Sequence, residues 1–462
     1  MVGSKQRYKA YPEYKDSGVE WLGKIPPHWQ IWKLNHFSPI ITCGVASTPE
    51  YVDDGVVFLS AQNVKNRKVD LTKGHKFISR KSHEELTKHR TPRKGDILLS
   101  RVGTVGEACV IDVDFDFSIF VSLTHLRLNN EICVNDFFIY LCASRYMESL
   151  HQAVTLVGGG VGNLNVNDFR EYQLPIPPVR EQLDIIKFLD YETAKIDTLI
   201  EKQQRLIELL IEKRQAVISH AVTKGLNSDV PMKDSGVEWL GEVPEHWEVS
   251  KFSYVKKVLT DYTANGSFAD LKSNVNYLDE PSYARLVRLT DLRVNLENTN
   301  GVWINKKSYD YLSKSALYGG EFLLANVGAH AGLFYQMPYG KGRASLAPNM
   351  FMAKFDDKKV SREFMAFIGQ SQGINEQLKL SATASSAQPK LNKDDFKAVK
   401  FAFPSLSEQA ELVEYLNRKL PSFDRLINKA QQAVQLMQER RTALISAAVT
   451  GKIDVRDWVN PE

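Results

Sequence analysis

The chain has 462 residues, of which 43% are hydrophobic and 25% are charged, as expected for a globular protein with two or three domains. No apolar stretch approaches the roughly 18 residues that a membrane-spanning helix needs, and residues 1–15 lack the apolar segment of a secretory signal. The net charge of +4 permits a nucleic-acid partner without requiring one, and four scattered cysteines with no Cys-x-x-Cys pair predict reduced thiols in a cytoplasmic protein.

The first 178 residues are predicted to form a β-rich domain. Near their start lies the segment KDSGVEWLG at residues 15–23, followed by His28 and Trp29. We interpret His28 and Trp29 as structural residues, with the indole anchoring this segment against the domain. The predicted strands are short β-branched stretches bounded by glycine, proline or charge, at residues 56–60, 96–102 and 108–113.

A long helix is predicted over residues 180–222. The proline-rich residues 175–178 and the pair Glu181-Gln182 are typical of a helix start. At 1.5 Å per residue such a helix would be about 60 Å long. A coiled-coil-like apolar stripe at seven-residue spacing, with intervening positions filled, consists of Leu189, Ile196, Leu199, Leu206, Leu210 and Val217.

The remainder of the chain repeats this order. Residues 233–241 again read KDSGVEWLG, 218 positions after the first copy (233 minus 15), and His246-Trp247 follows them. Later matches include Leu164-Asn165 with Leu391-Asn392, Glu181-Gln182 with Glu408-Gln409, and the helix ends around Ala221 and Ala448. Further strands are predicted at 285–289 and 321–327. A second helix carries Phe423, Leu426, Ala430, Met437 and Leu444, with a kink or a break into two helices expected at Pro421.

The repeat predicts an α+β fold with two β-rich domains separated by two long antiparallel coiled-coil-like helices. The β-rich domains are placed at 1–178 and 229–404, and the helical spacers at 179–228 and 405–462. A pseudo-twofold axis would relate the halves, as in dimeric DNA readers whose half-sites lie about one helical turn apart. Because the halves have diverged, their half-sites should differ in sequence.

The repeated KDSGVEWLG segment resembles the N-terminal signature of type I restriction-modification specificity (S) subunits. The junction from Leu164-Asn165 to Gln182 and the helix ends Ala221-Val222-Thr223 and Ala448-Val449-Thr450 are similar to the same family. The resemblance covers nearly the whole chain. It identifies the β-rich domains as target recognition domains, each reading half of a bipartite site in double-stranded DNA.

The resemblance also implies the partners. The two helices would act as a spacer and dock two methyltransferase (M) subunits, and restriction (R) subunits would complete the nuclease. S-adenosylmethionine would belong to the M subunits, ATP and Mg²⁺ to the R subunits, and the methyl acceptor would be adenine N6. This chain is expected to be non-catalytic, and its sequence has neither an Asn/Asp-Pro-Pro-aromatic motif nor a phosphate-binding loop with its lysine.

Base reading needs side chains with paired donors or acceptors, so polar clusters at strand ends are the candidates. Two clusters occupy equivalent places in the halves and differ in chemistry: Ser60, Gln62 and Asn63, and Arg288, Thr290 and Asp291. Two further loops offer Ser100, Arg101 and Thr104, and Asn326 and His330. For each cluster, DNA contact and an ordinary polar turn remain open, and a lone histidine such as His330 is more often structural.

Phosphate contacts are predicted for Asn163, Lys341, Arg343 and Lys390, with a solvated surface as the alternative. The glycine-rich residues 158–162 are interpreted as a plain loop or as a backbone contact to phosphate. Three other functions are alternatives: a DNA-binding protein that works alone, an enzyme such as a nuclease or fused methyltransferase, and a specificity subunit of a modification-only complex. A DNA-binding protein that works alone would need a compact reading helix, which the sequence does not show, and an enzyme would need the catalytic motifs that the sequence lacks. The third alternative stays open.

Overall fold

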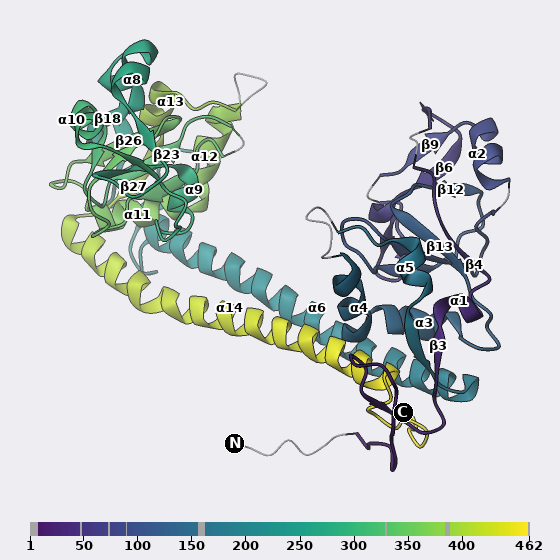
Figure 1. The fold of residues 1–462 in the computed structure, drawn as a ribbon. Helices are drawn as coiled ribbons and strands as arrows, with labels where there is room; N and C mark the ends of the chain where they lie inside the picture. Colours follow the sequence, from purple (N-terminus) through teal and green to yellow (C-terminus); the bar gives the residue numbers. More distant parts are fainter. Residues whose placement is uncertain are drawn as a thin grey trace. The chain divides into compact units, whose positions relative to one another are not determined.

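The computed structural model describes residues 8–46, 49–72, 74–88, 90–155, 162–328, 330–383 and 389–460. Contacts divide the chain into two compact units (Figure 1). The first unit comprises Met1–Gln204 and Gln431–Glu462, and the second comprises Arg205–Ala430. Each unit therefore takes one end of each long helix, so the helices are shared between the units. Within the described ranges, no helix is both long and apolar enough to cross a membrane.

The first unit is built on two four-stranded sheets. One has the antiparallel order β11 (Ala108–Val110), β10 (Ile97–Ser100), β13 (Leu123–Arg127) and β4 (Ile40–Cys43). The other has the order β12 (Phe117–Ile119), β6 (Val56–Leu59), β9 (Lys76–Ile78) and β5 (Tyr51–Val52), with β12 and β6 parallel. Short strand pairs join β14 (Gln173–Ile176) to β3 (Gln30–Lys33), β1 (Lys15–Asp16) to β2 (Lys24–Ile25), and β7 (Val64–Lys65) to β8 (Lys68–Val69). The helices are α1 (Leu34–Phe37), α2 (Arg80–Thr87), α3 (Asn135–Cys142), α4 (Arg145–Thr155) and α5 (Val166–Arg170).

The second unit repeats this plan. Its first sheet keeps the strand order, as β24 (Phe334–Gln336), β23 (Phe322–Ala325), β26 (Met350–Phe355) and β18 (Lys256–Asp261). Its second sheet has the order β19 (Tyr277–Leu278), β21 (Val302–Ile304), β20 (Ala284–Val287), β25 (Ala344–Leu346) and β22 (Ala316–Leu317), with β20 and β25 parallel. Strand β17 (Glu248–Lys251) pairs with β27 (Lys400–Phe403), and β15 (Met232–Asp234) with β16 (Glu242–Pro244). The helices are α7 (Phe252–Val255), α8 (Phe268–Asn274), α9 (Leu289–Leu292), α10 (Lys306–Tyr311), α11 (Arg362–Gln370), α12 (Gln372–Thr383) and α13 (Lys393–Ala398).

All five predicted strands are confirmed, as β6, β10, β11, β20 and β23, although their ends differ by a few residues from the expected bounds. The repeated Leu-Asn-x-x-Asp-Phe motif also has a structural reason. Asn165 and Asn392 cap the N-termini of α5 and α13 through their side chains. The leucine before each cap and the phenylalanine of each helix are buried, which fixes the helix against its sheet.

The predicted long helices are confirmed as α6 (Val179–Lys224) and α14 (Leu406–Val449). Of the two alternatives expected at Pro421, the break into two helices is wrong, because α14 continues through it. Proline removes one backbone donor and disfavours a helix interior. Here the flanking Leu420 and Phe423 are both buried in the core of the second unit, and this packing holds the helix together across the missing hydrogen bond.

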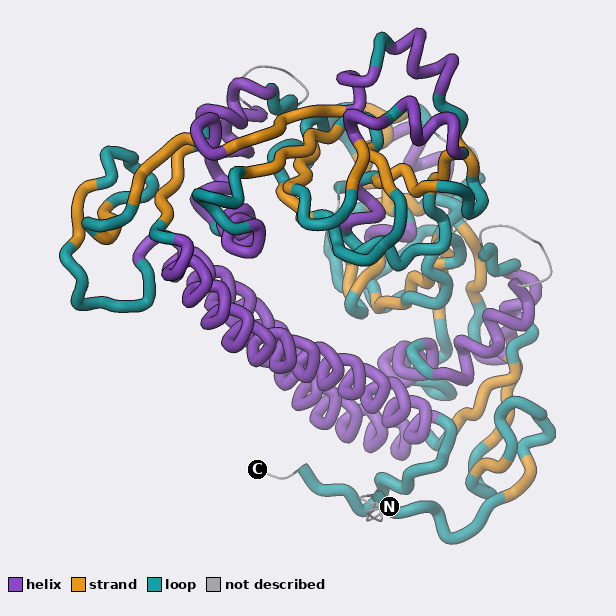
Figure 2. The backbone as a smooth tube through the Cα atoms, turned by 90° about the vertical axis from the view of Figure 1, so that its left-hand side faces the viewer, coloured by secondary structure: helices purple, strands orange, loops and turns teal. Residues whose placement is uncertain are grey.

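The two helices are antiparallel in each unit. In the first unit Arg441 of α14 forms an ion pair at 2.8 Å with Asp197 of α6, and Ala448 packs in the same core as Leu189. In the second unit Arg214 of α6 is 2.8 Å from Asp424 of α14. Figure 2 shows the paired helices side by side.

The predicted apolar stripe is correct only in part. Leu189 and Ile196 are buried, but Leu199, Leu206 and Leu426 are 50%, 43% and 51% exposed. The positions at strict seven-residue spacing stay on the contact face, since Leu210 and Val217 pack against a core and Ala430 is buried, so only the intervening positions were misplaced. Ile200, one position after Leu199, is buried instead.

The His-Trp pairs are structural, as expected, and each binds the first turn of a long helix. Glu181 of α6 accepts a hydrogen bond from Trp29 Nε1 at 3.0 Å, and its other oxygen lies 2.7 Å from His28 Nε2. The Tyr11 hydroxyl also donates to Glu181. The second repeat has the same arrangement, with Glu408 of α14 bound by His246 and Trp247. We call these the Glu181 cluster (Tyr11, His28, Trp29, Glu181) and the Glu408 cluster (His246, Trp247, Glu408).

The glutamine that follows each glutamate is fully buried and ties the helix start to its unit. Gln182 accepts from the backbone N–H of Val134 at 2.8 Å and donates to the carbonyls of Ile132 and Pro177. Gln409 makes the equivalent bonds in the second unit. One amide thus satisfies three buried backbone groups, which explains the repeated Glu-Gln pair.

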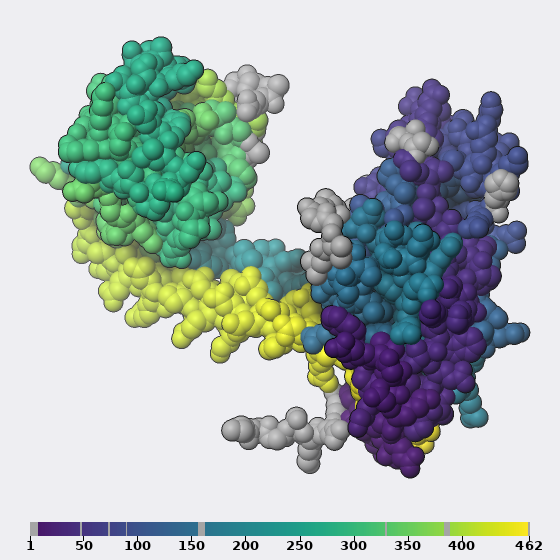
Figure 3. Space-filling model, viewed as in Figure 1, coloured from purple at the N-terminus to yellow at the C-terminus, as the bar shows by residue number. Residues whose placement is uncertain are grey.

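Each helix end is also fixed by equivalent contacts, and in the first unit the segment after α14 contacts the segment around Lys9. Ser446 accepts from the first backbone N–H of α4, and Ser219 does the same for α12. The Lys224 ammonium donates to the carbonyls of Leu240 and Glu242, and Lys452 donates likewise to those of Leu22 and Lys24. In the second unit the chain runs on directly into β15. In the first unit the helix end instead meets the N-terminal segment (Figure 3). Asp454 N donates to Lys9 O at 2.9 Å.

Candidate nucleic-acid interface

The turn after β6 holds three of the predicted DNA contacts. Ser60 is half-buried and Gln62 is exposed, but Asn63 is completely buried. The Asn63 amide accepts from Ser60 N at 3.0 Å and donates to the carbonyls of Asp70 and Gly74. Its hydrogen-bonding groups are therefore used within the turn. The structure corrects the prediction for Asn63, which shapes the turn and leaves Ser60 and Gln62 as its candidates.

The second predicted loop follows β10. Ser100 is buried, donates to Thr104 O at 2.5 Å and accepts from Glu107 N at 3.0 Å, so its predicted DNA contact is also corrected. Thr104 is exposed at the tip of the loop, and Arg101 is half-buried at its start. Gly103 has φ +79°, a backbone conformation that suits glycine and turns the loop away from the sheet.

Ser122, which no sequence motif singles out, joins these two loops. Its hydroxyl accepts from Ala61 N at 3.0 Å, and its carbonyl accepts from Arg101 N at 2.9 Å. The Arg101 guanidinium in turn donates to Asn163 Oδ1 at 3.0 Å. The structure thus brings together Ser60, Gln62, Arg101, Thr104 and Asn163, which we call the first polar edge.

The second unit has an equivalent edge at the end of β23. Asn326 N donates to Asn349 O at 3.1 Å, and Val327 forms a β-bridge with Lys390, just as Val102 does with Asn163. Asn326, Asn349 and Lys390 line a cavity of about 420 Å³ together with Phe268 and Lys393. We call Asn326, Asn349 and Lys390 the second polar edge. Asn349 was not predicted, yet it replaces Ser122 in this edge and has φ +65°.

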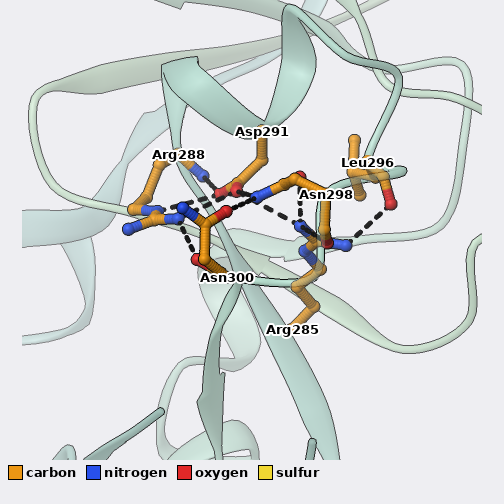
Figure 4. A network of polar contacts seen from close by, with 6 residues as sticks. All are labelled: Arg285, Arg288, Asp291, Leu296, Asn298 and Asn300. Atoms are coloured by element: carbon orange, nitrogen blue, oxygen red, sulfur yellow. Dashed lines mark hydrogen bonds and ion pairs between the residues drawn. The ribbon is translucent and has the colours of Figure 1, made fainter. Parts of the chain in front are cut away.

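The turn after β20 is fixed by a charged network (Figure 4). Asp291 is completely buried and accepts hydrogen bonds from Arg285, Arg288 and Asn298. Burial alone would raise the pKa of Asp291, but the hydrogen bonds from Arg288 and Asn298 outweigh it and lower the pKa to about 2. The prediction for Asp291 is therefore corrected to a structural role.

The guanidinium of Arg288 is held by Asp291 and by the Asn300 carbonyl at 2.8 Å, and its side chain is 36% exposed. Thr290, next to Asp291, is exposed. Arg288 and Thr290 therefore remain the candidates of this turn, which follows the same strand end as the turn of Ser60 and Gln62 in the first unit.

The other predicted residues lie apart from the second polar edge or on its border. His330 is exposed in the turn between β23 and β24. Lys341 and Arg343 precede β25, whereas Asn349 follows it, so the two cations lie at the opposite end of that strand. Lys341 is 3.7 Å from Glu297, and the Arg343 guanidinium stacks on Tyr283 at 4.7 Å. Residues 158–161 of the glycine-rich loop lie outside the described residues.

In the part of the chain that the structure describes, no group of three or more His, Cys, Asp or Glu side chains could hold a metal ion. The polar groups of both edges are instead amides, hydroxyls and cations. These are the groups that bind DNA phosphates and base edges.

Comparisons with known proteins agree with this arrangement. The family model of the type I restriction modification DNA specificity domain matches residues 26–209 and 244–436. The chain is 22% identical over 441 residues to the type I restriction enzyme StySPI specificity subunit of Salmonella potsdam, covering 93% of this chain and 90% of that one. It is 21% identical over 444 residues to the EcoKI specificity subunit of Escherichia coli K12, with the same coverage.

A solved structure on complex assembly of the type I R-M system contains a similar chain. Its TM-score is 0.67 at 15% identity, and the match covers 93% of this chain and 99% of that chain. At this identity the likeness concerns the fold.

Proposed function

Since the chain belongs to the type I restriction modification DNA specificity family, we propose that it selects an asymmetric, two-part DNA target for partner subunits that methylate adenine and cleave DNA. One observation carries this proposal most directly. The two units place polar side chains at the same strand ends, and the side chains differ. Ser60, Gln62 and Arg101 in the first unit correspond to Arg288, Thr290 and Asn326 in the second. Two readers with one backbone plan and different side chains suit two different half-sites.

The reaction chemistry is assigned to partners. S-adenosylmethionine would be bound by two M subunits, and ATP and Mg²⁺ by the R subunits, while this chain supplies DNA sequence recognition in the cytoplasm. Asn163, Lys341, Arg343 and Lys390 are proposed as contacts to DNA phosphates, where cations and amides give affinity and orientation without sequence information.

The exposed apolar side chains of the long helices are proposed as the docking surface for the M subunits. Leu199, Leu206 and Leu209 are 50%, 43% and 45% exposed. Their spacings of seven and three residues put them on one face of α6. Leu426 and Leu436 of α14 are also exposed. Several large apolar side chains along one helix face mark a surface that a protein partner covers.

A double substitution Leu199→Asp/Leu206→Asp is expected to weaken binding of the M subunit by about 30- to 1000-fold, because each central apolar side chain of an interface contributes roughly 1–2 kcal/mol. Affinity is measured by titrating purified M subunit against the chain. Leu183→Asp/Ile211→Asp is the matched control, since both residues are exposed on α6 but lie on other faces. Equal losses in both variants would rule out this docking face.

The proposed function is tested by expressing the chain with a cognate M subunit and mapping N6-methyladenine by long-read sequencing. The expected result is a new asymmetric methylated motif of two parts with a fixed gap. Two results would contradict the proposal: a stable complex that methylates no such motif, or a chain that binds DNA but does not bind the M subunit. The second result would favour a DNA-binding protein that works alone.

A further inference from the structure

Arg101 and Asn326 occupy the same backbone position in the two units. Arg101 donates its N–H to Ser122 O and accepts from Leu164 N, both at 2.9 Å. Asn326 donates its N–H to Asn349 O at 3.1 Å and accepts from Leu391 N at 2.9 Å. Both residues follow the last position of a buried strand. The fold therefore holds the main chain in the same way at these two positions, whereas the side chains differ.

The Arg101 guanidinium is oriented but only partly used. Its Nε donates to Leu164 O at 2.8 Å and one Nη2 hydrogen is directed at Asn163 Oδ1. A guanidinium has five N–H donors, so three remain for another molecule. Two parallel N–H groups match the O6 and N7 acceptors of guanine in the major groove. Asn163 and Leu164 O hold the plane of the group in advance, which lowers the entropy lost on binding.

Asn326 presents a different pair of groups. Its Oδ1 is buried and has no hydrogen-bond partner among the described residues. A buried carbonyl oxygen without a partner is energetically unfavourable, so a ligand that donates a hydrogen bond to it is favoured. Asn326 also lines the open cavity beside Asn349 and Lys390. A carboxamide accepts from N6 and donates to N7 of adenine.

We propose that residues 101 and 326 are the equivalent base-reading positions of the two units, with Arg101 reading a guanine in one half-site and Asn326 reading an adenine in the other. This inference rests on the proposed function and adds which residue reads which base. Lys390 of the second polar edge then binds a phosphate and helps to hold the DNA in register.

The neighbouring backbone allows the two side chains to be exchanged. Gly103 and Gly328 follow at the same distance with φ +79° and +88°, so both loops turn in the same way. Arg101→Asn and Asn326→Arg therefore change the reading groups on a matched backbone. Each variant tests the inference separately.

The experiment uses the complex with the M subunit and a panel of duplexes in which every base pair of the methylated motif is changed in turn. With the unsubstituted chain, changing one G·C pair of one half-site and one A·T pair of the other is expected to lower affinity by about 10- to 100-fold each. In the Arg101→Asn complex the preference for G·C at that position is expected to be lost or to change to a preference for A·T. The base preferences at all other positions are expected to be unchanged. Asn326→Arg has the reciprocal effect in the other half-site.

Arg80→Asn is the matched control, because Arg80 is an exposed arginine of the same unit that pairs with Asp116. It should leave every preference unchanged. Unaltered base preferences in both exchange variants would overturn the inference. An equal loss of affinity on all duplexes would overturn it as well, because that result indicates a contact to phosphate. Failure of the unsubstituted complex to methylate a two-part motif would instead count against the proposed function.

Discussion

Replacing Asp291 by alanine is expected to lower the free energy of unfolding by about 3–5 kcal/mol, as found when one partner of a buried ion pair is removed. Asp291 is the shared acceptor of Arg285, Arg288 and Asn298, and the side chain of Arg285 is only 8% exposed. Without the carboxylate, the Arg285 charge stays buried with neutral partners alone. Urea denaturation followed by circular dichroism measures the change.

The first repeat suggests the control for this variant. Where the second repeat has Arg285 and Asp291, the first has Val57 and Asn63 at the equivalent positions of β6 and its turn. The double variant Arg285→Val/Asp291→Asn is therefore expected to recover a large part of the loss, because it removes both buried charges. A single variant that loses less than about 1 kcal/mol would show that the network is well solvated.

The same carboxylate makes stability depend on pH. The pKa of Asp291 is about 2 in the folded chain, against 3.8 for an unperturbed aspartate. As pH falls, Asp291 is therefore protonated first in the unfolded chain. The ionised carboxylate contributes about 2 kcal/mol to the free energy of unfolding, and this contribution is complete above pH 4 and is lost as pH falls towards 2. The stability difference between the unsubstituted chain and Asp291→Asn should narrow over that interval. A difference that is constant from pH 5 to pH 2 would contradict the assignment.

Glu181→Ala is expected to destabilise the chain by about 2–4 kcal/mol. The substitution removes the acceptor of two buried donors, Trp29 Nε1 and the Tyr11 hydroxyl, and each unsatisfied donor costs roughly 1–3 kcal/mol. Burial, together with the hydrogen bond to Glu181, raises the pKa of Tyr11 well above its usual value, so the phenol keeps the proton that it donates. Thermal and urea unfolding report the loss.

Glu408→Ala is the matched variant in the second repeat. The side chain of Glu408 is 28% exposed against 6% for Glu181, and no tyrosine donates to it among the described contacts. Water can therefore replace part of what Glu408 supplies, and the expected loss is about half as large. Equal losses in the two variants would show that burial of the cluster does not set the cost.

The duplicated sequence predicted the architecture well because repetition is independent of tertiary contacts. Matching KDSGVEWLG, Leu-Asn and Glu-Gln in order was enough to place both β-rich units and both helices. The partners of these motifs were not predictable. Glu181 meets His28 and Trp29 across more than 150 residues of chain, and spacing along the sequence contains no sign of that pairing.

Burial explains the site residues that were corrected. In the sequence, Asn63, Ser100 and Asp291 have the residue types of base-reading groups. In the structure, each forms hydrogen bonds with backbone or arginine groups in or next to its own turn. Ser122 and Asn349 were missed for the opposite reason. Each is a single polar residue next to a strand, and only the sheet brings it beside Arg101 or Asn326. Polar type predicts candidates, and the register of neighbouring strands decides among them.

Because each unit includes one end of both long helices, the second unit can fold on the ribosome before the first unit. The core around Trp29 and Leu189 includes Ile445, Ala448 and Val449, which are synthesised after the second unit. The second unit, Arg205–Ala430, contains all of its own residues once position 430 has emerged. The unit that begins first therefore cannot complete its core until residues beyond the second unit have been made, whereas the second unit can complete its own core earlier. A nascent chain stalled ahead of residue 431 would display the apolar interior of its N-terminal half to chaperones and proteases.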